Sequence, residues 1–183
     1  MQDTSRLFFA LWPDDKTRLA LTRLTQSMTA EQLRWVPPHN LHVTLVFLGS
    51  VDTNTQLLLK QSVADISVQP FTLIFDNLSY WSKPGILCQT CRQSVPEEAV
   101  ILASALSAVA ADCGLQTDTR PYTPHITLAR HARHLPNIEV EPIAWHAEAF
   151  CLIESCSEPD GVRYKVIQSW PFIKSTVNPD RSL

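Results

Sequence analysis

Two segments of the chain carry the same pattern, His-x-Thr-Leu, inside a run of apolar residues. NLHVTLVFLG contains His42 and Thr44, and PHITLAR contains His125 and Thr127. Successive side chains of a β-strand point to opposite faces, so each His and Thr share one face and the apolar residues share the other. A strand can hold such a polar pair if one face lines a cleft and the other faces the core.

The repetition of the pattern predicts two similar halves, each of which delivers one His-x-Thr strand. Two halves packed about a pseudo-twofold axis would bring both polar pairs to one cleft. A lone H-x-T-L string means little, because a single His on a strand is more often a hydrogen-bonded structural residue than a catalyst. Two copies, each after a proline-containing turn, favour a functional site over coincidence.

The composition is that of an ordinary globular protein. The 183 residues fall between one typical domain and two small ones, and 45% are hydrophobic and 18% charged. The formal net charge of −3 argues against a broad, non-specific surface for nucleic acid but permits a small basic cleft. The N-terminal run LFFALW is far too short to span a membrane. We expect a cytoplasmic monomer that does not contact a membrane.

The cysteines raise one alternative class of protein. Cys88-Gln-Thr-Cys91 has the spacing of a metal or redox motif, and His131 and His134 could supply two further zinc ligands. The chain has no second CxxC motif, however, and the first lies inside a strand-like run, GILCQTC. We therefore expect structural, reduced cysteines and no metal site.

Apolar spacing and turn residues predict an alternation of strands and helices. Strands are expected in LFFALW, in the His42 segment up to Gly49, and in FTLIFDNLSYW, GILCQTC, PHITLAR, IAWHAEAFCLIES and VRYKVIQSWPF. Helices are expected from Pro13 to Met28, from a capping box at Thr53-x-x-Gln56, and from a second capping box at Ser94-x-x-Glu97 up to Gly114. Because several strands are adjacent in sequence, the pattern indicates an α+β fold with mainly antiparallel pairing.

Four segments together resemble the two-histidine (2H) phosphoesterases, and specifically the bacterial RNA 2′,3′-cyclic phosphodiesterases long called 2′-5′ RNA ligases. They are RLFFALWP, NLHVTLVFLG, RPYTPHITLAR and RYKVIQSWPF, which span nearly the whole chain in the family's order. The resemblance implies one two-lobed domain over residues 1–183, with two pseudo-symmetric, mainly antiparallel sheets flanking a central groove and helices on the outer faces. It also implies hydrolysis without a metal or a nucleotide cofactor.

The resemblance further implies a role for each motif residue. Opening a cyclic phosphodiester needs a base for the attacking water and an acid for the departing ribose oxygen, and imidazole can be either near neutral pH. The family pattern makes His42 the proton donor and His125 the proton acceptor. Thr44 and Thr127 would donate hydrogen bonds to the non-bridging phosphate oxygens. The substrate would be RNA or an oligonucleotide with a 2′,3′-cyclic phosphate end, and the product a 2′-phosphomonoester.

Other residues are expected to contact the substrate. Arg130 occupies the family's position for a basic residue in the second motif and is expected to contact phosphate. For Arg133, His131 and His134 we prefer a solvated loop. Possible contacts to the nucleotide come from three aromatic residues, of which the first is more naturally a core residue: Phe9, Tyr122 and Tyr164.

Two alternatives to the hydrolase remain open from the residues. An RNA ligase that joins a 2′,3′-cyclic phosphate end to a 5′-hydroxyl would use the same residues. A non-enzymatic module that binds RNA ends would need the basic groove but not both histidines, and this chain has both.

Overall fold

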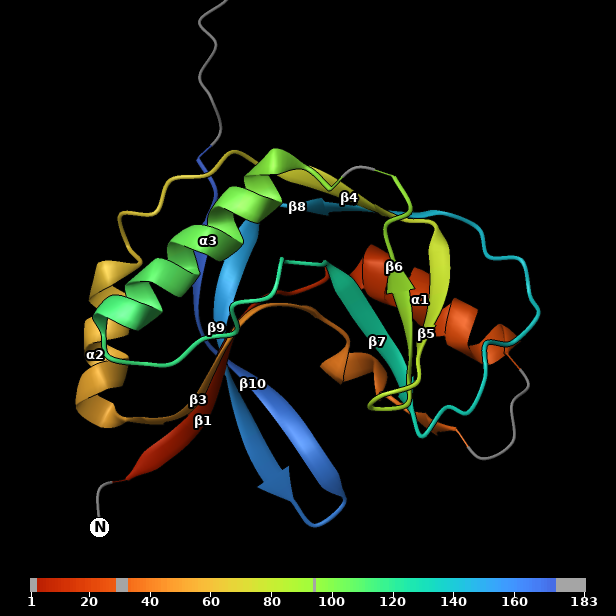
Figure 1. Cartoon of the computed structure of the whole chain (residues 1–183), viewed down its shortest axis with the longest axis horizontal. Helices are drawn as coiled ribbons and strands as arrows, with labels where there is room; N and C mark the ends of the chain where they lie inside the picture. Colours follow the sequence, from red (N-terminus) through yellow and green to blue (C-terminus); the bar gives the residue numbers. More distant parts are fainter. Residues whose placement is uncertain (1–2, 29–32, 94, 174–183) are drawn as a thin grey trace, which may run out of the picture.

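The computed structural model describes residues 3–28, 33–93 and 95–173 (Figure 1). Three α-helices are present in the part of the chain that it describes: α1 (Asp15–Ser27), α2 (Thr53–Ser62) and α3 (Glu97–Asp112). A short 3-10 turn, η1 (Pro38–Asn40), precedes the first motif. The strands are β1 (Thr4–Leu11), β2 (Arg34–Trp35), β3 (Val43–Asp52), β4 (Phe71–Phe75), β5 (Asn77–Trp81), β6 (Ile86–Thr90), β7 (His125–Arg130), β8 (Ile143–Ala147), β9 (Ala149–Glu158) and β10 (Gly161–Pro171).

The strands form one large sheet and one small one. Seven strands follow the order β10-β9-β1-β3-β7-β6-β5, and β2 joins them by pairing with β7 to give an eight-stranded sheet. Strands β4 and β8 make a separate two-stranded sheet. The registered pairs between the described strands are all antiparallel. The predicted α+β fold with mainly antiparallel pairing is therefore confirmed.

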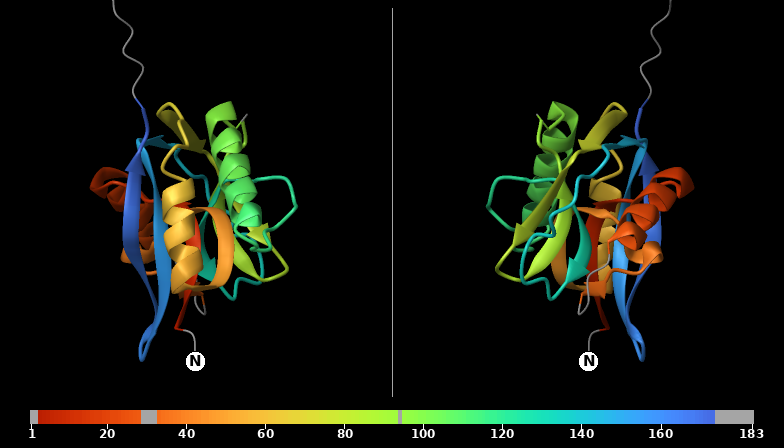
Figure 2. Two further views of the ribbon diagram at one scale, coloured as in Figure 1. Left: turned by 90° about the vertical axis from the view of Figure 1, so that its left-hand side faces the viewer. Right: turned by 90° about the vertical axis from the view of Figure 1, so that its right-hand side faces the viewer.

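The large sheet has two halves, which meet where the motif strands pair. Strand β3 belongs to the half that contains β1, β9 and β10, and β7 belongs to the half that contains β5 and β6. The two halves are joined through one registered pair, Val43 with Ile126. Helices α2 and α3 lie beside the first half and contact β3, whereas α1 contacts β8 of the small sheet and η1 (Figures 1 and 2).

Apolar residues of the motif strands pack into the main core. Val43, Leu45, Ile126 and Leu128 are buried, as the alternation of the two motifs predicts. They are joined there by the inward face of α3, whose Leu102 and other apolar residues are also buried. Each motif strand is thus held firmly on one face, and its other face is free to carry polar side chains.

Several boundaries differ from those expected from the sequence. Strand β3 does not end at Gly49 but continues to Asp52. Gly49 adopts a positive φ of 74° and pairs with Leu7, and the irregularity in the pairing with β1 lies at the preceding residue, Leu48, which has no partner. Asp52, not Thr53, caps α2 by accepting hydrogen bonds from the backbone N–H groups of Asn54 and Thr55.

Two long apolar runs each split into two strands. FTLIFDNLSYW divides at Asp76 into β4 and β5, and IAWHAEAFCLIES divides at Glu148 into β8 and β9. The division has a topological cause, since β4 pairs with β8 while β5 and β9 stay in the large sheet. Helix α3 follows Pro96, which supplies no side-chain cap, and the expected capping residue Ser94 lies outside the described residues.

Candidate active site

The pairing of β3 with β7 brings the two motifs side by side. Val43 pairs with Ile126 in antiparallel register, so the residues that flank this pair also approach one another: His42 lies toward Thr127, and Thr44 toward His125. Val43 and Ile126 both point into the core, so the four polar side chains share the opposite face. The two histidines and two threonines selected from the sequence therefore gather at one place.

Both imidazole rings are oriented in the same way. Nδ1 of His42 lies 2.7 Å from the carbonyl oxygen of Asn40, and Nδ1 of His125 lies 2.9 Å from that of Thr123. A carbonyl oxygen can only accept, so Nδ1 carries the proton in each ring and Nε2 of the neutral ring is an acceptor. Each Nε2 is thus the nitrogen left to exchange a proton with a substrate.

The environment of the rings disfavours their charged forms. The pKa of His42 is lowered to about 4, mainly by burial and to a smaller extent by positive charge on His125 and Arg130, while the bond to the Asn40 carbonyl opposes the shift. Burial also lowers the pKa of His125, again opposed by its carbonyl partner, Thr123. The pKa of His42 therefore depends on the charge of Arg130 and on the protonation of His125. In the free protein at neutral pH both rings are neutral.

Thr44 completes the local geometry of the first motif. Its Oγ1 lies 3.0 Å from Nε2 of His42, and because Nε2 is an acceptor, the hydroxyl donates. This bond keeps the hydroxyl next to the nitrogen that would exchange a proton. An anion that accepted a hydrogen bond from the Thr44 hydroxyl would be held beside Nε2 of His42.

Aromatic rings surround both histidines. The ring of His42 lies 5.0 Å from those of Phe8 and Tyr164 and 6.2 Å from that of Trp12, all measured between centroids. The ring of His125 lies 4.6 Å from that of Trp81. These contacts explain why burial depresses the pKa values and limit the directions in which each ring can turn.

A β-bulge in each motif strand decides which later residues face the site. In the pairing of β3 with β1, Leu45 has no partner, and in the pairing of β7 with β6, Leu128 has none. Both residues are the leucine of the His-x-Thr-Leu pattern. Strict alternation would turn Phe47 and Arg130 into the core, but one inserted residue moves each to the other face. Both are exposed, and Arg130 lies close enough to His42 to lower its pKa.

Asn40 ties the first motif to the C-terminal hairpin. Its side-chain Nδ2 donates to the carbonyl oxygen of Val162 at 2.6 Å, and its Oδ1 accepts from the backbone N–H of Tyr164 at 3.0 Å. Its own carbonyl oxygen accepts from His42. One buried amide thus fixes the position of β10 relative to the catalytic candidate His42.

The remaining candidate residues have different surroundings. Tyr164 contacts the ring of His42, whereas the Phe9 ring is fully buried and packs edge-on against those of Phe150 and Trp170, in agreement with the preference for the core. Tyr122 borders a cavity next to His125, but its hydroxyl is buried with no hydrogen-bond partner among the described residues. Its burial raises the pKa of the phenol.

The CxxC motif begins on β6 and ends at Cys91, directly after this strand. Cys88 is buried on β6, and burial raises the pKa values of the Cys88 and Cys91 thiols to about 12 and about 11. Such thiols stay protonated at neutral pH, which makes them poor metal ligands. Among the described residues no group of three or more His, Cys, Asp or Glu side chains is arranged to hold a metal ion.

Sequence reasoning missed several residues of the site. Phe8, Trp12 and Trp81 pack on the histidines, and Phe47 is exposed beside Thr44. Only Phe47 had a usable signal, its equivalence with Arg130 three residues after the motif threonine. The others reach the site through pairing between distant strands, which no local pattern encodes.

Comparisons with known proteins agree with this geometry. The family model described as LigT like Phosphoesterase matches residues 11–88. The chain is 30% identical to the RNA 2′,3′-cyclic phosphodiesterase of Escherichia coli (strain K12) over 93% of this chain and 98% of the relative. It is also 30% identical to the RNA 2′,3′-cyclic phosphodiesterase of Thermus thermophilus, over 90% and 89% of the two chains.

The fold is shared with a solved structure of the same kind. The crystal structure of E. coli LigT complexed with 3′-AMP matches with a TM-score of 0.84 and 28% identity, over 94% of this chain and 100% of that one. None of the helices that the structure describes has the length and apolar character needed to cross a membrane. The paired motifs, the fold and the full-length relatives lead to one conclusion: the chain belongs to the LigT-like phosphoesterases, the family of the RNA 2′,3′-cyclic phosphodiesterases.

Proposed function

We propose that this protein hydrolyses the 2′,3′-cyclic phosphate at the end of an RNA chain and leaves a 2′-phosphomonoester. The observation that carries the proposal is the matched orientation of His42 and His125 on one face. Each ring is fixed through Nδ1 and keeps Nε2 for proton exchange. Two imidazoles are what the reaction needs, since one proton must leave the attacking water and another must reach the departing oxygen.

The proton transfers follow from this arrangement. Nε2 of His125 takes a proton from a water molecule as the water oxygen attacks phosphorus. The bond from phosphorus to the ribose 3′-oxygen breaks, and Nε2 of His42, protonated before the step, gives its proton to that oxygen. The result is a 2′-phosphate and a free 3′-hydroxyl. His42 and His125 are interchangeable in geometry, so their order as donor and acceptor rests on the family resemblance.

Phosphate binding is assigned to side chains near the rings. Thr44 already donates a hydrogen bond toward Nε2 of His42, and Thr127 occupies the equivalent position in the second motif. The guanidinium of Arg130 adds positive charge on the same face and can stabilise the charge that develops on the phosphate oxygens. Tyr164 borders His42 and is a candidate contact for the nucleotide.

One relative offers direct support for a nucleotide ligand. E. coli LigT has been crystallised with 3′-AMP, a ribonucleotide that carries a phosphate on its 3′-oxygen. Since the two chains share their fold over nearly their whole lengths, the same kind of ligand is expected here. We further propose that the protein acts as a monomer in the cytoplasm, and size-exclusion chromatography would test the oligomeric state.

The proposal is tested with a short RNA that ends in a 2′,3′-cyclic phosphate. We expect hydrolysis in the presence of EDTA, with a 2′-phosphate as the dominant product by phosphorus NMR. A dominant 3′-phosphate would exchange the roles of His42 and His125, and activity that depends on added metal would contradict the mechanism. A second RNA with a 5′-hydroxyl end, included in a parallel reaction, reveals ligation if a joined product forms.

A further inference from the structure

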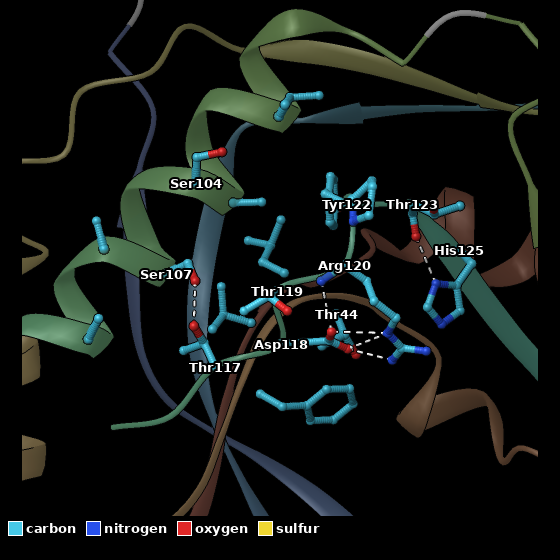
Figure 3. Close-up of a pocket in the computed structure, with 18 of the residues that line it drawn as sticks. Thr44, Ser104, Ser107, Thr117, Asp118, Thr119, Arg120, Tyr122, Thr123 and His125 are labelled. Carbon is cyan, nitrogen blue, oxygen red and sulfur yellow. Dashed lines mark hydrogen bonds and ion pairs between the residues drawn. The ribbon is translucent and has the colours of Figure 1, made fainter. Parts of the chain in front are cut away.

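A cavity of about 1050 Å³ opens beside the candidate active site. It is bounded by α3, by residues 117–123, and by Thr44 to Phe47 together with His125; we call it the α3 cavity. Figure 3 shows Ser104 and Ser107 of α3 pointing toward the same space that Thr44 and His125 border from the strand side. Ligand pockets usually measure about 300–1,000 Å³, so this volume fits a nucleoside or more rather than a phosphate alone.

The position of the α3 cavity suits the part of the RNA that lies beyond the nucleotide with the reacting phosphate. Thr44 and His125 line it, but His42, Arg130 and Tyr164 do not. The ribose that bears the cyclic phosphate is bonded directly to the reacting phosphorus and must therefore lie at the two histidines. The space that begins at Thr44 and His125 therefore adjoins the place of the reacting phosphate and is available to the next part of the substrate.

The chemistry of the walls suits an uncharged nucleoside. Asp118 and Arg120 are the only Asp, Glu, Lys or Arg side chains among the described residues of the wall, and they pair with each other, so they contribute no net charge. The remaining polar groups include hydroxyls, among them Ser107 and Thr117, which lie 2.7 Å apart and can also reach a ligand. Hydroxyl groups serve both the ribose and the edges of a base.

Phe47 supplies an aromatic surface at this cavity. Its side chain is 60% exposed because the bulge at Leu45 turns it out of the core. Its ring lies 5.9 Å from that of Phe8, which packs on His42. Three rings in contact therefore extend from His42 to the cavity. Exposed aromatic rings of this kind are the usual platforms on which unpaired bases stack.

From these observations we infer that the α3 cavity binds the second nucleoside of the RNA, the one that precedes the nucleotide with the cyclic phosphate. The inference rests on the proposed hydrolysis of cyclic RNA ends and adds a preference for length. The enzyme acts more efficiently on a linear dinucleotide that ends in a 2′,3′-cyclic phosphate than on a nucleoside 2′,3′-cyclic phosphate. The base of the second nucleoside stacks on Phe47 while its ribose meets the hydroxyls of α3 and of residues 117–123.

The test compares uridine 2′,3′-cyclic phosphate with a dinucleotide that ends in the same group. Stacking of one base is worth a factor of roughly 5 to 150 in binding, so kcat/KM for the dinucleotide should exceed that for the mononucleotide at least about fivefold. Ser104→Phe, which fills the cavity, should reduce this ratio to about one. Ile101→Phe introduces the same ring on the exposed part of α3 that does not line the cavity, and should keep the ratio.

The outcomes separate this inference from the proposed function. Hydrolysis of neither substrate by the unmodified protein would remove the proposed function itself. Equal kcat/KM for both substrates would overturn only the cavity inference. An equal loss on both substrates in Ser104→Phe would place the terminal nucleoside in the cavity and would also overturn it. If thermal melting shows that Ser104→Phe is unfolded, Phe47→Ala takes its place, with the same collapse of the ratio expected.

Discussion

At the scale of single residues, His42 has an environment that opposes the role given to it. A proton donor must be charged before the step, yet the pKa of His42 lies at about 4 in the free protein, mainly because the ring is buried and partly because Arg130 and His125 are near. A bound phosphate anion reverses part of this effect, because a negative charge beside an imidazole raises its pKa. Substrate binding therefore favours the protonated form of His42, which a proton donor requires.

This reversal predicts different pH profiles for two kinetic constants. The profile of kcat/KM reports the free enzyme and that of kcat the complex with substrate. We expect bell-shaped curves for both, with the maximum of kcat/KM below pH 6.5 and the maximum of kcat at a higher pH. Steady-state kinetics from pH 4 to 9 measure both. Coincident maxima near pH 8 would show that the charge of the phosphate does not control the histidines.

The same depressed pKa predicts how stability depends on pH. Between the unfolded pKa of about 6.5 and the folded pKa of about 4, the unfolded chain binds more protons at His42, so stability falls as the pH falls through this range. At roughly 1.4 kcal/mol per pKa unit, the loss approaches 3 kcal/mol. Urea unfolding at pH 7 and pH 4 should show that the free energy of unfolding falls less in His42→Gln than in the unmodified protein. An equal loss in both proteins would place the acid sensitivity elsewhere.

At the scale of secondary-structure elements, the two bulges are the features that shape the site. Leu45 and Leu128 occupy the same position in their motifs, and each shifts the alternation of its strand by one residue. The consequence differs between the lobes, because the displaced residue is Phe47 in one and Arg130 in the other. One lobe thus offers an aromatic surface and the other a positive charge.

The position of Arg130 predicts a specific loss of phosphate binding. Arg130→Ala should raise KM for a cyclic-phosphate RNA about tenfold, because a contact to phosphate is removed. KM should also depend less on salt, since the salt dependence of binding grows with the number of phosphates that positive side chains contact. Arg133→Ala removes the same charge from an exposed position three residues later and should change neither. Activity assays between 20 and 200 mM salt compare the two variants. A salt dependence that Arg130→Ala leaves intact would exclude this contact.

The link from η1 to β10 predicts an indirect effect on catalysis. Asn40→Ala leaves the carbonyl of Val162 and the N–H of Tyr164 without their partner, which should cost about 1–3 kcal/mol in the free energy of unfolding. The support of the His42 ring should loosen as well, so kcat should fall more than KM rises. His39→Ala, at the exposed neighbouring position of η1, is the matched control. A normal kcat in a folded Asn40→Ala protein would limit Asn40 to stability.

At the scale of the whole molecule, the sequence predicts what depends on local pattern and repetition. The His-x-Thr faces, the three helices and the α+β class all follow from periodicity within single segments. The pairing of β4 with β8 does not, because it separates residues that are continuous in sequence. The bulges likewise become visible only from the register with β1 and β6. The rings around His42 come from β1 and from β10, near opposite ends of the chain.

The meeting of the two motif strands finally predicts how the histidines depend on each other. The two rings come from strands of different halves that meet at Val43 and Ile126, yet they serve the same displacement at phosphorus. His42→Ala and His125→Ala should each lower kcat roughly 10²–10⁴-fold. Because acid and base act in one step, removal of the second should add little to the loss from the first, as in other sites whose residues act as a unit. Single-turnover rates of the two single variants and the double variant measure this coupling. Losses that multiply, with the double variant slower by the product of the two single factors, would mean that the histidines act in separate steps.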